Sequence, residues 1–97
     1  MGLAVEDRKD LEWLIKASVK EAKTPISLAR KMMPRQGNIE DFAYGLITGM
    51  IIGNFTEQFK NKNRRQPDTD EIVEIFSIMR RNMPAVRKSI INELGDY

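Results

Sequence analysis

The sequence contains no cysteine and no histidine. Without cysteine there is no disulfide, no thiolate nucleophile and no cysteine ligand for zinc or an iron-sulfur cluster. Without histidine the chain also lacks the commonest general base and a frequent metal ligand. These absences disfavour most catalytic chemistry, so we expect a non-enzymatic protein with no cofactor and no metal. The lack of cysteine also fits an intracellular location.

Long hydrophobic runs are missing as well. The opening residues, MGLAVEDRKD, carry charges too early to supply the apolar core of a secretory signal. The most apolar segment, residues 42–53, is shorter than the roughly 20 residues that a membrane-spanning helix requires. We therefore expect a cytoplasmic chain that does not enter a membrane.

An excess of one charge sign is also absent. Sixteen lysines and arginines face 14 aspartates and glutamates, and the resulting net charge of +2 does not by itself indicate a nucleic-acid partner. Apolar residues make up 41% of the chain, too many for a disordered protein. The length of 97 residues leaves room for one core, which predicts a single helical domain over residues 1–97.

Apolar residues recur at helical spacing in the first third of the chain. Leu11, Ile15 and Ala22 share one face of a helix predicted over residues 7–23, with Asp7 as its N-cap. Proline suits the first position of a helix, so a short helix is expected from Pro25 to Met33. Pro34 and Gly37 lie in the break that follows.

The longest helix is expected from Ile39 to about Lys60, with Asn38 as its cap. Between Phe42 and Gly53, apolar and small residues occupy almost every position around this helix. Such a pattern is typical of a central helix that is buried on all sides.

The last third of the chain begins with a capping signal. Asp68 precedes Glu71 at capping-box spacing, although aspartate replaces the usual serine or threonine. An apolar stripe then continues at helical spacing through Ile72, Ile75, Phe76, Met79 and Met83. Pro84 either kinks this helix or opens another one that continues to Gly95. Because no strand pattern competes, the sequence predicts an all-α fold, a compact four- or five-helix bundle with a central buried Gly-rich helix.

The most specific motif is the series Gly45, Gly49 and Gly53, which aligns three residues without side chains along one ridge of the long helix. Each glycine inside a helix costs about 0.5 to 1 kcal/mol relative to alanine, so close packing against another backbone is expected to compensate. The favoured interpretation is a helix crossing within the chain. A homodimer seam and a ligand lying on the ridge are the alternatives.

Basic residues form clusters that offer a different function. If the fold gathers them on one face, they can contact the phosphates of a nucleic acid. Lysine and arginine near helix ends also favour solubility and meet the negative end of the helix dipole, which is the simpler explanation. The candidates for phosphate contacts are Arg64, Arg65, Arg80, Arg81, Arg87 and Lys88.

Two further features have a structural and a functional interpretation. Trp13 lies off the apolar stripe of its helix and either anchors a partner protein or packs against Leu3 or Val5. Several carboxylates can in principle hold Mg²⁺, but their positions at helix starts make capping the simpler explanation. These carboxylates are Glu40, Asp41, Asp68, Asp70, Glu71 and Glu74.

From these features we expect a helical protein-protein interaction module. The partner is the chain itself or another protein, and the glycine-bearing helix provides close packing. The main alternative is a small nucleic-acid-binding regulator, whose binding would weaken steeply as salt rises. A carboxylate-based metal enzyme is the third hypothesis.

Overall fold

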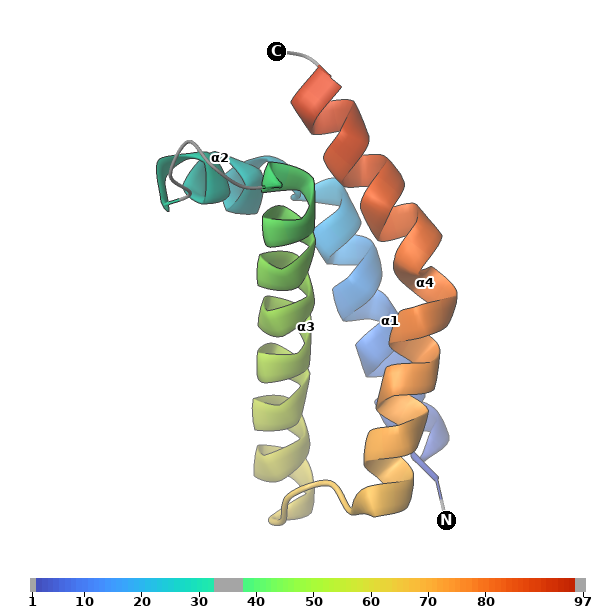
Figure 1. Cartoon of the computed structure of the whole chain (residues 1–97). Coiled ribbons are helices and arrows are strands. Elements are labelled where there is room, and N and C mark those ends of the chain that lie inside the picture. Colours follow the sequence, from blue (N-terminus) through green and yellow to red (C-terminus); the bar gives the residue numbers. More distant parts are fainter. Residues whose placement is uncertain (1, 33–37, 96–97) are drawn as a thin grey trace.

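The computed structural model describes residues 2–32 and 38–95, which form four helices and no strand. The helices are α1 (Val5–Lys20), α2 (Lys23–Met32), α3 (Ile39–Asn63) and α4 (Thr69–Gly95). Figure 1 shows α3 and α4 side by side with α1 behind them, while the short α2 lies across the end where α1 finishes and α3 begins. The all-α prediction is confirmed, and of its two forms the four-helix bundle is the one observed.

α1 begins two residues earlier than predicted. Ala4 is its N-cap and makes no side-chain capping bond, so the prediction that Asp7 caps this helix is wrong. Asp7 instead lies in the first turn, is buried, and accepts a 3.3 Å bond from the Lys62 ammonium of α3. Burial of a carboxylate requires such a charged partner. Asp7 therefore ties the start of α1 to the end of α3.

α2 also begins two residues earlier than predicted, so Pro25 is its third residue and not its first. Proline is tolerated there because the first four amides of a helix have no intrahelical partner. The predicted end at Met33 and the break at Pro34 and Gly37 lie outside the described residues. Pro25, Ile26 and Ala29 are buried, and they fix α2 against α3.

The predicted caps of the two long helices are confirmed. The Asn38 side chain accepts a 3.1 Å bond from the Asp41 amide at the start of α3. Asp68 and Glu71 form a reciprocal capping box, in which each side chain accepts a 2.9 Å bond from the other's amide. α3 ends with Arg64 in the left-handed conformation, at a φ of 60°.

α4 continues through Pro84 as one helix. Proline lacks the amide that would bond to the Arg80 carbonyl four residues earlier. Both residues are exposed, so water can reach that carbonyl. Pro84 therefore interrupts the ladder on the solvent side of α4, and the buried side remains continuous through Met79, Val86 and Ile90.

The core is built around one face of α3. Its buried row, spaced every four residues, meets α1, α2 and α4 and consists of Ala43, Ile47, Ile51, Phe55 and Phe59. Opposite this row the helix is exposed. The expected burial of α3 on all sides is therefore not confirmed, because residues 2–32 and 38–95 form only three other helices and none of them covers its outer face.

Candidate functional site

The three glycines of α3, which we call the glycine ridge, lie on the outer surface of the molecule. Gly45, Gly49 and Gly53 follow buried residues of α3 by two positions, which at 3.6 residues per turn places them about 200° away, on the opposite side of the helix. All three are exposed, and a Cβ atom added to any of them would meet nothing within 4 Å. The favoured interpretation, a crossing within the chain, is therefore not observed among residues 2–32 and 38–95. The ridge has no neighbour within the described residues.

Exposed apolar side chains of α4 lie beside α3 on this side. Ile72 is 40% exposed and Phe76 is 56% exposed. Together with Ile52 and Thr56 of α3 they line a shallow hollow of about 270 Å³ between the two helices. Both α4 residues belong to the predicted apolar stripe. They are its exposed members, whereas Ile75 and Met79 are buried and Met83 is half-buried. We call the ridge with Ile52, Ile72 and Phe76 the α3–α4 face.

Two of the six predicted phosphate-binding residues have structural roles. Arg87 contacts Glu40 and Asp41, each at 3.2 Å, and its guanidinium lies 4.6 Å from the centre of the Tyr44 ring. The Arg65 guanidinium donates a bidentate pair of hydrogen bonds to the two carboxylate oxygens of Glu71, at 2.6 and 3.0 Å. These contacts join α4 to the start of α3 and to the loop that follows α3. Their positive charge is already matched by carboxylates.

The Arg65 contact also changes the acidity of its partner. Glu71 is only 5% exposed. The hydrogen bond from Arg65 lowers the pKa of the Glu71 carboxyl, and the capping bond from the Asp68 amide acts in the same direction, while burial opposes both. Glu71 is therefore held as an anion that joins the loop to α4.

The other four predicted phosphate-binding residues are dispersed. Arg64 follows the end of α3, whereas Lys88 lies 19 residues beyond the start of α4, about 28 Å along that helix. Arg80 and Arg81 are adjacent and therefore about 100° apart around α4. All four are exposed. The structure does not bring the six residues together on one patch.

Trp13 lies on the outer side of α1 and is 66% exposed. Of its two interpretations, packing against Leu3 or Val5 has the weaker support, because most of the Trp13 side chain is exposed. Trp13 instead lines a groove of about 560 Å³ between α1 and α4, together with Lys16, Lys20 and Ala85. This volume falls within the about 300 to 1,000 Å³ that is usual for binding sites.

The contribution of the α1 lysines to this groove was missed in the sequence. Lys9, Trp13, Lys16 and Lys20 are spaced by four, three and four residues, which places them on one helical face. That spacing was the available signal. It is easily overlooked because charged residues on the outer side of a helix are ordinary.

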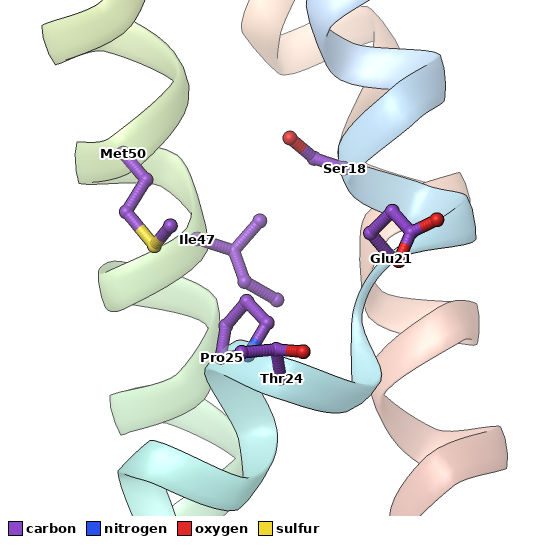
Figure 2. A pocket seen from close by; sticks show the side chains of 6 residues that line it. All are labelled: Ser18, Glu21, Thr24, Pro25, Ile47 and Met50. Carbon is purple, nitrogen blue, oxygen red and sulfur yellow. The ribbon is translucent and has the colours of Figure 1, made fainter.

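A second hollow lies where α1 turns into α2. Figure 2 shows Ile47 and Met50 of α3 on one side of it, Ser18 of α1 and the C-cap residue Glu21 on the other, and Pro25 of α2 below. Its volume is about 180 Å³, smaller than that of a typical ligand pocket. We assign it no binding role.

The carboxylates considered for Mg²⁺ have partners within the protein. Glu40 and Asp41 contact Arg87, Asp68 and Glu71 form the capping box, and Glu74 contacts Arg8 at 2.6 Å. Among residues 2–32 and 38–95, no group of three or more acidic residues is arranged to hold a metal ion.

Neither hydropathy nor comparison with other proteins assigns a function. No helix among the described residues combines the length and apolar character needed to cross a bilayer. Comparisons with protein families, curated proteins and solved structures found no match for this chain.

Proposed function

We propose that this chain is a non-enzymatic, cytoplasmic interaction module that associates with a second copy of itself through the α3–α4 face. The observation that carries the proposal is the exposed glycine ridge. Glycine in a helix interior costs about 0.5 to 1 kcal/mol per residue relative to alanine. Within the described part of the chain, no atom lies close enough to exclude a side chain at Gly45, Gly49 or Gly53. Close approach of a second backbone would require all three.

The apolar residues beside the ridge support the same proposal. A helix seated on Gly49 and Gly53 can also reach Ile52, and across the hollow it can reach Phe76 of α4. Burial of these side chains would supply the hydrophobic part of the association energy. A standard interface takes about 800 Å² from each partner, about one-eighth of the 6791 Å² accessible surface of this chain. One long face of the bundle can provide that area.

Nucleic-acid binding, the second hypothesis, has weaker support. Arg65 and Arg87 are engaged with carboxylates. Arg64 and Lys88 lie towards opposite ends of α4, so a short stretch of phosphates cannot contact both. Self-association through the ridge requires no rearrangement of these ion pairs.

Disulfide trapping tests the proposal. The chain has no cysteine, so single substitutions Gly45→Cys, Gly49→Cys and Gly53→Cys each introduce one thiol. In a two-fold dimer, residues near the axis lie beside their own copies. We expect at least one ridge variant to form a cross-linked dimer under mild oxidation much faster than Asn54→Cys, an exposed control about 100° from Gly53 around α3. Equal, slow cross-linking of all four variants would contradict the proposal.

A further inference from the structure

The groove between α1 and α4 carries an inference that does not depend on self-association. It lies between α1 and α4, and Figure 1 shows α1 behind the α3–α4 pair. Its floor is apolar and includes Ile15, Ala17, Val19 and Ala85. A 66% exposed tryptophan over such a floor is a typical anchor for a partner side chain.

Positive charge surrounds this apolar floor. Lys16 and Lys20 of α1 line the groove directly. On α4, Arg81 and Lys88 share a face with the lining residue Ala85, being four residues before it and three after it. None of these four cations forms an ion pair with another described residue.

The contacts within the bundle explain why this side is basic. Glu6, Asp7 and Asp10 of α1 all lie within 4 Å of Lys62 of α3, so the acidic residues near the start of α1 face α3 and share one lysine there. At the other end, Ser89 donates a 2.8 Å bond to the Val19 carbonyl. Lys20 follows Val19 in the sequence and Lys88 precedes Ser89, so this bond brings the backbone positions of the two lysines near each other. One exposed carboxylate, Glu12, adjoins Trp13 in the sequence. Against the four cations of the groove, this single negative charge leaves the net charge around the groove positive.

We propose that this groove binds an acidic amphipathic helix of a partner protein. The apolar side chains of such a helix would cover Trp13 and the floor, and its aspartates and glutamates would face Lys16, Lys20, Arg81 and Lys88. A nucleic-acid backbone would match the charges but leave the apolar floor uncovered. A flat anionic membrane would not fill the hollow. The charge pattern and the hollow together favour the helix.

The single tryptophan makes binding measurable on the intact chain. The probe is a synthetic helical peptide of about 16 residues, about 24 Å long, with a leucine stripe flanked by aspartate and glutamate. We expect a saturable blue shift of Trp13 fluorescence and binding that weakens as salt rises. A peptide with the same leucine stripe but lysine in place of each acidic residue should give no shift.

Variants define the site. The double substitution Lys16→Glu and Lys20→Glu should weaken peptide binding by about tenfold or more, whereas Lys31→Glu on α2 should leave it unchanged. Trp13→Ala, measured with a fluorescently labelled peptide, should weaken binding by about 30-fold without changing the chain's mass in solution. An unchanged mass separates this site from the α3–α4 face.

Three results would overturn the inference. The first is the absence of any shift with the acidic peptide, and the second is equal binding of the basic peptide. The third is a shift produced by phosphatidylserine vesicles or a single-stranded oligonucleotide but not by the acidic peptide, which would assign the groove to a membrane or to nucleic acid.

Discussion

At the scale of single residues, the predicted caps of α3 and α4 are correct, whereas the predicted cap of α1, Asp7, is wrong. The capping pair Asp68 and Glu71 was visible from spacing alone, and both of its hydrogen bonds are present. The Asn38 cap was equally local. The role of Asp7 was not predictable, because its partner Lys62 lies 55 residues further along the chain. The same holds for Arg87, whose carboxylates belong to the start of α3.

Glu71 gives a residue-scale prediction with a defined sign. Arg65 lowers the pKa of this carboxyl from its usual value of 4.5. A carboxyl with a lowered folded-state pKa stabilises the fold above its unfolded-state pKa, and that contribution is lost as pH falls through the folded-state value. We therefore expect Glu71→Gln to lower the free energy of unfolding at pH 7, with the difference shrinking below pH 4.5.

Urea unfolding of both proteins between pH 7 and pH 2 measures that difference. Glutamine retains an oxygen for the Asp68 amide, so the comparison isolates the charge. A difference that stays constant to the lowest pH would show that Glu71 contributes through packing and not through its charge.

At the scale of elements, periodicity identified the helices but not which side of each one is covered. The apolar stripe of α4 includes Ile72 and Phe76 beside the buried Ile75 and Met79. Nothing in the local pattern separates the exposed pair from the buried pair, because the division depends on where α3 lies. In the same way, glycine spacing indicates close approach without identifying the partner. The exposed ridge could be recognised only once the other helices were in place.

Gly49→Ala tests the exposure of the ridge. Because an added Cβ meets no atom within 4 Å, alanine should raise the free energy of unfolding of the single chain by about 0.5 to 1 kcal/mol. Urea unfolding at a protein concentration low enough to dissociate dimers measures this. A decrease would mean that another segment packs on Gly49.

At the scale of the whole molecule, the all-α class and the helix order followed from composition and periodicity. The placement of charge did not follow, since it depends on contacts between distant segments. Arg87, Lys62 and Arg65 form ion pairs at the start of α3, at its end and in the loop that follows it. Lys16 and Lys20 on the outer side of α1 form no ion pair with a described residue. The bundle therefore presents two unlike surfaces. One is a glycine and apolar face on α3 and α4, and the other is a basic groove between α1 and α4.

The central claim is that the α3–α4 face joins two copies of the chain. Its most direct test is solution mass by light scattering over a range of protein concentrations, for the natural chain and for Gly49→Leu, with Asn54→Leu as the control. We expect a mass approaching twice 11.2 kDa for the natural chain and for the control, and 11.2 kDa for Gly49→Leu with its helical content intact. A natural chain that stays at 11.2 kDa at every concentration, or a Gly49→Leu variant that still dimerises, would contradict it.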